Sequence, residues 1–270
     1  HVSNAAGFGF FDGRNMKFET EKLSKMGVKE TWLPEVCTGI EKLGLYRNRQ
    51  VTTAIGDNQA SFLGAAGKEE NTLLVNMGTG GQISILSDQY FAEKGIEARP
   101  FLDGKYLLVG SSLCGGKSYA LLEQFFRRVV KAVTGEDSSL YPVMEQFAKT
   151  GKEQSNRISE DRKLKIRTTF DGTRTDPKSS GSIQGLTSDN FTPEAFTYGI
   201  LEGMGDELYQ MYRTIKNGTG IQIKNLIGSG NGVRKNPVFC EMLEELFQNK
   251  LVLSAYKEEA AAGAAISSML

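Results

Sequence analysis

The chain has 270 residues, and its 32 lysine and arginine residues equal its 32 aspartate and glutamate residues. This length can bury a sizeable core and could be one large domain or one and a half ordinary domains. Balanced charge without a basic block argues against a nucleic acid or an acidic membrane surface as partner, and no apolar run approaches the roughly 20 residues that span a bilayer.

The cysteine and histidine content excludes several catalytic classes. Cys37, Cys114 and Cys240 are far apart and odd in number, which indicates reduced thiols and a cytoplasmic protein. The only histidine is His1, so a Ser-His or Cys-His nucleophile would lack its base, and a zinc site is not expected. Because the chain opens on His1 rather than on methionine, we expect an upstream portion to precede it.

Residues 1–50 mix glycine, charge and short apolar pieces, and they predict no core of their own. Residues 8–11 suit a short strand that ends in an Asp12-Gly13 turn, and residues 19–26 suit one short helix. We expect this segment to pack on structure that the upstream portion supplies.

From residue 51 the pattern becomes that of an α/β domain. Residues 51–55 are a β-branched run, and Asp57 with Asn58 would make a good N-cap for a helix of small residues. Small side chains there imply close approach to another backbone. A carboxylate at this position can accept a proton from a hydroxyl group.

Two strands follow, over residues 72–77 and 82–86, and the glycine-rich turn Gly78-Thr79-Gly80-Gly81 separates them. Such a turn can offer backbone N–H groups to phosphate. It is also what an ordinary hairpin uses. Taken alone, the turn favours the hairpin.

The next predicted elements are a strand over residues 106–109 and a helix that begins after Gly115-Gly116. Apolar residues recur along one stripe of this helix, and we interpret the stripe as core rather than as a cofactor site. It consists of Leu122, Phe125, Phe126, Val129 and Val133.

Residues 134–162 are polar and predict a surface excursion with a short helix around residues 141–148, followed by an exposed-edge strand over residues 164–169. Phe170-Asp171-Gly172-Thr173 is similar to the aspartyl-nucleophile signature of haloacid-dehalogenase-type phosphatases. The preceding acidic residue of that signature is absent, so we interpret Asp171 as part of a turn.

A nucleotide-cradling arrangement is predicted near the end of the chain. Thr192-Pro193 begins a long amphipathic helix, a strand over residues 221–227 leads into Gly228-Ser229-Gly230-Asn231-Gly232, and Asn236-Pro237 starts the next helix. Glycines permit backbone approach, and a helix N-terminus presents N–H groups to a ligand. The spacing matches neither the dinucleotide-binding fingerprint nor the Walker pattern, so those two classes are disfavoured.

The order of these motifs resembles the C-terminal half of FGGY-type carbohydrate kinases, members of the actin-like ATPase superfamily. The residues between the motifs look most similar to the sedoheptulokinase branch. The matching motifs are Gly56-Asp57-Asn58-Gln59, Gly78-Thr79-Gly80, Gly115-Gly116, Gly228-Ser229-Gly230-Asn231 with Asn236-Pro237, and the small-residue helix over residues 258–265.

This resemblance implies an α/β fold of the ribonuclease H-like, actin-like ATPase type, with a mixed five-stranded sheet flanked by helices on both faces. It implies that residues 1–50 are the end of a first, sugar-binding domain and that residues 51–270 are a second, ATP-binding domain. The family's Asp-x-Gly-Thr phosphate loop is not present in these 270 residues. We therefore expect this chain by itself not to phosphorylate a sugar.

The resemblance also implies roles for individual residues. Asp57 would accept the proton of the attacking sugar hydroxyl, and Asn58 would contact the sugar. The turn Gly78, Thr79 and Gly80 would hold the β- and γ-phosphates of ATP. The nucleoside would lie against Gly115, Gly116, Gly228, Gly230, Asn231 and Asn236.

The expected function is an ATP-dependent kinase that phosphorylates a primary hydroxyl of a ketose or polyol, with a sedoheptulose-like sugar favoured. The expected partners are ATP, the Mg²⁺ that ATP carries, and a small-molecule sugar; no further metal is expected, and a homodimer stays open. The alternative is a non-catalytic, nucleotide-binding relative that uses ATP as a switch.

Overall fold

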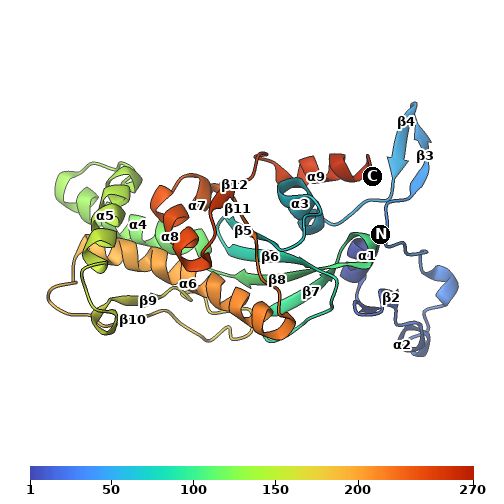
Figure 1. Cartoon of the computed structure of the whole chain (residues 1–270), viewed down its shortest axis with the longest axis horizontal. Helices are drawn as coiled ribbons and strands as arrows, with labels where there is room; N and C mark the ends of the chain where they lie inside the picture. The colour runs from blue at the N-terminus through green and yellow to red at the C-terminus, as the bar shows by residue number, and fades with distance from the viewer.

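The computed structural model describes residues 1–270, except for the side chain of Asp161, and it centres on one mixed sheet (Figure 1). The sheet has six strands in the order β12-β11-β5-β6-β8-β7; the first three run parallel and the others pair antiparallel. The bounds are Leu251–Leu253 for β12, Asn225–Ser229 for β11, Thr72–Met77 for β5, Gly81–Ser87 for β6, Tyr106–Ser112 for β8 and Ile96–Pro100 for β7. The predicted α/β fold with a mixed sheet is confirmed.

Two strand predictions were wrong. The sheet has six strands rather than five because β7 was missed. It carries Glu97, Arg99 and Pro100, which weaken a strand pattern, and it is tolerated because it is an edge strand that pairs only with β8. The strand predicted from Ile221 begins only at Asn225, after a stretch without regular structure.

Helices cover both faces of the sheet, as predicted (Figure 1). On one face, α3 (Asp57–Ala66) and α9 (Glu259–Ser267) lie over Leu74 and Leu107. On the other face, α6 (Pro193–Thr219) and α8 (Pro237–Phe247) lie over Leu73 and its neighbours. Successive residues of β5 alternate between the two cores, as the period of a strand requires.

At one end of the molecule lie α4 (Gly115–Thr134), α5 (Tyr141–Ser155) and α7 (Asn231–Arg234) (Figure 1). The predicted core stripe of α4 is wrong over most of its length, because Phe125, Val129 and Val133 are 61%, 52% and 81% exposed. The buried residues of this 20-residue helix all lie in its first half, so its second half extends beyond the sheet core.

The remaining elements form no part of the central sheet. The β3–β4 hairpin projects from the body and leaves Leu45 and Tyr46 exposed (Figure 1). No helix among the described residues combines the length and the apolar character that a membrane crossing needs. The helices outside the central sheet and its covering layers are α1 (Val2–Ala5) and α2 (Thr20–Lys25), with the 3₁₀ turns η1 (Ala6–Phe8), η2 (Glu30–Trp32), η3 (Leu102–Gly104) and η4 (Glu160–Arg162). The strands outside the central sheet form three antiparallel pairs: β1 (Phe11–Asp12) with β2 (Lys17–Phe18), β3 (Lys42–Tyr46) with β4 (Arg49–Thr52), and β9 (Lys165–Arg167) with β10 (Ser182–Gln184).

The close crossing of α3 and α9 fixes the position of α3. A Cβ atom on Gly64 would collide with the carbonyl oxygen of Glu259, and one on Gly263 would collide with the carbonyl oxygen of Ala60. The two helices therefore touch backbone to backbone, which confirms the close approach predicted from their small residues.

Gly263→Ala tests this contact. Alanine normally stabilises a helix interior by up to about 1 kcal/mol relative to glycine. Here the added Cβ would have to displace the α3 backbone, so we expect a loss of about 2 kcal/mol or more in the free energy of unfolding. Urea unfolding measures the loss, with the exposed neighbour Ala264→Ser as a control expected to change little. If the free energy of unfolding of Gly263→Ala equals that of the wild type, the close crossing of α3 and α9 is contradicted.

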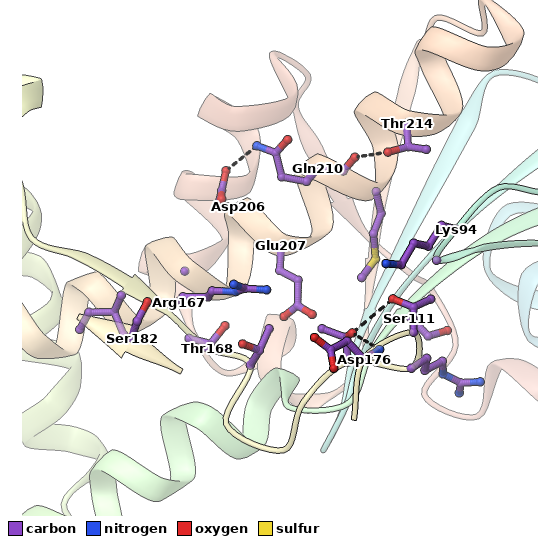
Figure 2. Close-up of a pocket in the computed structure, with 18 of the residues that line it drawn as sticks. Lys94, Ser111, Arg167, Thr168, Asp176, Ser182, Asp206, Glu207, Gln210 and Thr214 are labelled. Carbon is purple, nitrogen blue, oxygen red and sulfur yellow. Dashed lines mark hydrogen bonds between the residues drawn. The ribbon is translucent and has the colours of Figure 1, made fainter. Parts of the chain in front are cut away.

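A pocket of about 610 Å³ lies between α6, β8 and the segment that follows β9 (Figure 2). Figure 2 shows Glu207 of α6 pointing into it, near Arg167. Burial raises the pKa of the Glu207 carboxyl, although the hydrogen bond that Ser112 Oγ donates to it, at 2.8 Å, acts in the opposite direction.

Glu207→Gln should therefore change how stability depends on pH. In the unfolded chain the carboxyl ionises near its ordinary value of 4.5, whereas the folded chain holds the proton to a higher pH. The wild-type free energy of unfolding should thus fall, relative to that of the variant, as the pH rises through and above 4.5. Urea midpoints across this range test the prediction, and parallel curves for the two proteins would contradict it.

Candidate functional site

The loops that carry the predicted site residues meet at one end of the sheet. β5, β8 and β11 point in the same direction, because β11 is parallel to β5 and β8 is related to it through the antiparallel β6. Their carboxyl ends lead into residues 78–80, residues 113–116 and residues 230–232. Ligands of open α/β sheets bind at this kind of edge.

The start of α4 packs directly on the glycine turn that follows β5. The N–H groups of Gly116 and Lys117 donate to the carbonyl oxygens of Gly78 and Thr79, each at 3.0 Å. A Cβ on Gly116 would collide with the carbonyl oxygen of Gly78, so this contact requires glycine. The turn is thus held by a helix N-terminus, whose positive dipole end favours an anion.

The glycine loop after β11 reaches the same point from the other side. Gly230 has a φ of +79°, and a Cβ there would lie 2.5 Å from the carbonyl oxygen of Met77. Both its backbone conformation and its surroundings therefore require glycine. The end of β5 thus lies between α4 and the loop after β11.

A pocket of about 850 Å³ opens between these loops. Six of the predicted residues line it: Gly78, Thr79, Gly116, Gly230, Asn231 and Asn236. Five others do not, namely Asp57, Asn58, Gly80, Gly115 and Gly228. A Cβ on Gly115 would meet the backbone of Gly80, one on Gly80 would meet the carbonyl oxygen of Ser112, and Gly228 lies in β11 under Val233 and Leu251.

Several lining residues were missed by the sequence analysis. Tyr119 of α4 and Tyr141 of α5 stack with ring centroids 6.0 Å apart, and burial raises the pKa of the Tyr119 hydroxyl. The first five residues of the helix that begins at Gly115 could have indicated Lys117 and Tyr119. Tyr141 belongs to a separate helix that no motif marks. The other missed lining residues are Ala120, Pro142, Glu145, Leu201, Met204 and Lys235, while Gly232 belongs to the predicted glycine loop.

Asn236 has a structural role as well as a place in the pocket wall. Its side-chain oxygen accepts a hydrogen bond from the N–H of Phe239 at 3.0 Å and so caps α8, as predicted. The hydroxyl of Tyr119 contacts the side chain of Asn236, so the cap of α8 is part of the pocket wall.

Asp57 is the first residue of α3 and does not line this pocket. Two residues further on, Gln59 Nε2 donates to the carbonyl oxygen of Pro100 at 2.8 Å, and Pro100 pairs with Tyr106, the first residue of β8. The prediction that Asp57 and Asn58 form the N-cap was wrong, because the N-cap is Gly56 and its helix begins at Asp57.

Asp57 and Asn58 each have a side-chain oxygen that makes no hydrogen bond within the protein. Asp57 is exposed, and one carboxylate oxygen accepts from the N–H of Asn58 at 2.7 Å, which orients the side chain and leaves the other oxygen for a proton. The side-chain oxygen of Asn58 is buried without a hydrogen-bond partner. A buried acceptor of this kind is costly unless something donates to it.

An ion pair lies at the mouth of the pocket. Lys117 Nζ and Asp171 Oδ2 are 2.6 Å apart, and this contact raises the pKa of the lysine and lowers the pKa of the aspartate. Asp171 lies in a turn, as expected, and also accepts from Cys114 Sγ at 3.6 Å. None of the predicted site residues lines the pocket of Figure 2.

The relatives of this chain are sugar kinases. Mouse sedoheptulokinase is 25% identical over 266 residues, which are 90% of this chain and 53% of that protein. The crystal structure of xylulose kinase from Rhodospirillum rubrum gives a TM-score of 0.81 at 18% identity, covering 99% of this chain and 54% of that one. Plasmodium falciparum glycerol kinase, solved with ADP, gives 0.77 at 20%, covering 98% and 53%.

These likenesses confirm the predicted actin-like ATPase fold. The chain spans about half the length of the curated relatives it matches. The C-terminal domain of the FGGY family of carbohydrate kinases matches residues 73–270, which is most of the chain. The chain therefore belongs to the FGGY family of carbohydrate kinases.

Proposed function

We propose that this chain is the ATP-binding part of a kinase that transfers the γ-phosphate of ATP to a primary hydroxyl of a ketose or polyol. The pocket that the glycine turn lines carries the proposal, because phosphoryl transfer needs a phosphate cradle, and we assign Asp57 as the base that the reaction also needs. The predicted division into residues 1–50 and residues 51–270 is part of it.

The chain's own residues would act in a single in-line step. Asp57 accepts the proton of the substrate hydroxyl while the oxygen of that hydroxyl attacks the γ-phosphorus. The bond between that phosphorus and the β–γ bridging oxygen breaks, and ADP leaves. Gly78, Thr79 and Gly80, which the start of α4 holds in place, would hold the phosphate oxygens in line.

The pocket fits a nucleotide. Its lining combines backbone glycines at the phosphate end with Tyr119 and Tyr141 at the other end, an apolar surface suited to a base. Side chains on Gly116 or Gly230 would fill the space beside the glycine turn. Mg²⁺ would travel with the triphosphate and neutralise developing charge.

For the sugar, we propose a sedoheptulose-like ketose, with xylulose and glycerol as the competitors named by the relatives. Asn58 supports a polyhydroxyl substrate, since its buried, unpartnered side-chain oxygen could accept from a sugar hydroxyl. The three unpaired cysteines support a reducing, cytoplasmic setting for this reaction.

The alternative is a nucleotide-binding relative without catalysis, in which ATP switches an interaction. Such a protein has no use for the base that we assign to Asp57. ADP release that depends on added sugar separates the two functions. A coupled assay with sedoheptulose, xylulose, ribulose and glycerol, on the longest natural form of the protein, also identifies the substrate.

Asp57→Asn tests the base. We expect kcat to fall by about 10²-fold or more, because the amide cannot accept the proton, while the KM for ATP changes little. The matched control is Asp103→Asn, since Asp103 precedes β8 at the opposite end of that strand and pairs with Lys68. An undiminished rate in Asp57→Asn would exclude Asp57 as the base.

Ala120→Trp tests the nucleotide pocket. The indole would occupy the space beside Tyr119 that we assign to the nucleoside, so ATP affinity should fall by about tenfold or more. Ala132→Trp, at an exposed position of the same helix, should bind ATP as the wild type does. Equal ATP affinities for the two variants would place the nucleoside elsewhere.

A further inference from the structure

Lys117 is the cation at the phosphate end of the nucleotide pocket. Its N–H donates to the carbonyl oxygen of Thr79 at 3.0 Å, and its side chain lines the same pocket as Gly78 and Thr79. The other lysine of the lining, Lys235, follows α7 on the far side of the glycine loop. Of the two lysines in the lining, Lys117 is therefore the one whose backbone N–H is hydrogen-bonded to the glycine turn.

The partner of Lys117 comes from a different part of the chain. Asp171 lies in the turn after β9, and its carboxylate contacts Lys117 Nζ at 2.6 Å. The two side chains are 42% and 43% exposed, and solvent-exposed ion pairs of this kind contribute little to stability. The pKa of Lys117 is raised by this contact, so the ammonium stays charged.

We propose that Lys117 binds the terminal phosphate of ATP, and that Asp171 holds the ammonium beside the phosphate turn until ATP replaces the carboxylate as its partner. This inference rests on the proposed function. Lys117 would touch the substrate, whereas Asp171 is a positioning residue that acts through Lys117.

The direction of the exchange follows from charge and solvation. A terminal phosphate presents more negative charge than a carboxylate, and a charge-assisted contact strengthens where water is excluded. The Lys117–Asp171 pair is half exposed, so little is lost when it opens. Lysine suits this task because its ammonium is a point charge on a flexible stem that can reach two partners.

Lys117→Met and Asp171→Asn give opposite predictions. Loss of the ammonium should weaken binding of β,γ-imido-ATP by about tenfold or more and leave ADP, which lacks the terminal phosphate, within about twofold. Asp171→Asn removes the competing carboxylate and should tighten β,γ-imido-ATP by about two- to fivefold. Lys117→Arg should restore most of the affinity. Calorimetry on the longest natural form of the protein measures these affinities for the wild type and the three variants.

The matched control is Lys131→Met. Lys131 lies on the same helix and forms the same kind of pair, with Asp137 at 2.7 Å, about 21 Å further along the helix axis. Both nucleotide affinities should be those of the wild type.

Three outcomes would overturn the inference. Unchanged ATP affinity in Lys117→Met would show that the ammonium does not reach the phosphate. Weaker ATP binding in Asp171→Asn would show that the pair is a fixed clamp rather than an exchange. A wild-type protein that binds neither nucleotide would overturn both this inference and the proposed function. If the wild type binds ATP and Ala120→Trp does not, the proposed function stands whatever the result for Lys117.

Discussion

Backbone crowding around the last residue of β5 is the constraint on which the site depends. Met77 is fully buried, and its atoms lie where Cβ atoms of Gly81, Gly115, Gly230 and Gly232 would stand. Four glycines from three loops therefore surround one methionine. Because none carries a side chain, the glycine turn, the start of α4 and the loop after β11 can approach within backbone contact, and the pocket forms between them.

The position of Asp57 depends on a different contact, on the other face of the sheet. The Gly64–Gly263 crossing holds α3 against α9, and the core below them includes Phe62 and Leu74. The glycine turn is held instead by α4, which packs near α6 on the opposite face. Asp57 and the glycine turn are thus supported by separate cores that share only the sheet, so the rigidity of the sheet fixes their relative positions.

The glycine-containing parts of the site could be predicted from the sequence because a glycine marks a place where another backbone can approach, even though the sequence does not show which one. Gly116 and Gly230 are examples, since each contacts a neighbouring loop through the backbone. What the sequence could not show was which helix brings side chains to the pocket. Tyr141 lies on α5, and only the folded chain places it against Tyr119. Asp171 likewise reaches Lys117 from 54 residues away.

The errors in the fold have physical causes of the same kind. The stripe of α4 was periodic, but periodicity shows only that one side of a helix is apolar, and what covers that side is a tertiary property. Phe125 is exposed because the second half of α4 extends beyond the core of the sheet. The edge strand β7 shows the converse, since pairing with β8 overrides a sequence that contains charges and a proline. In both cases the neighbour, rather than the local pattern, decides the outcome.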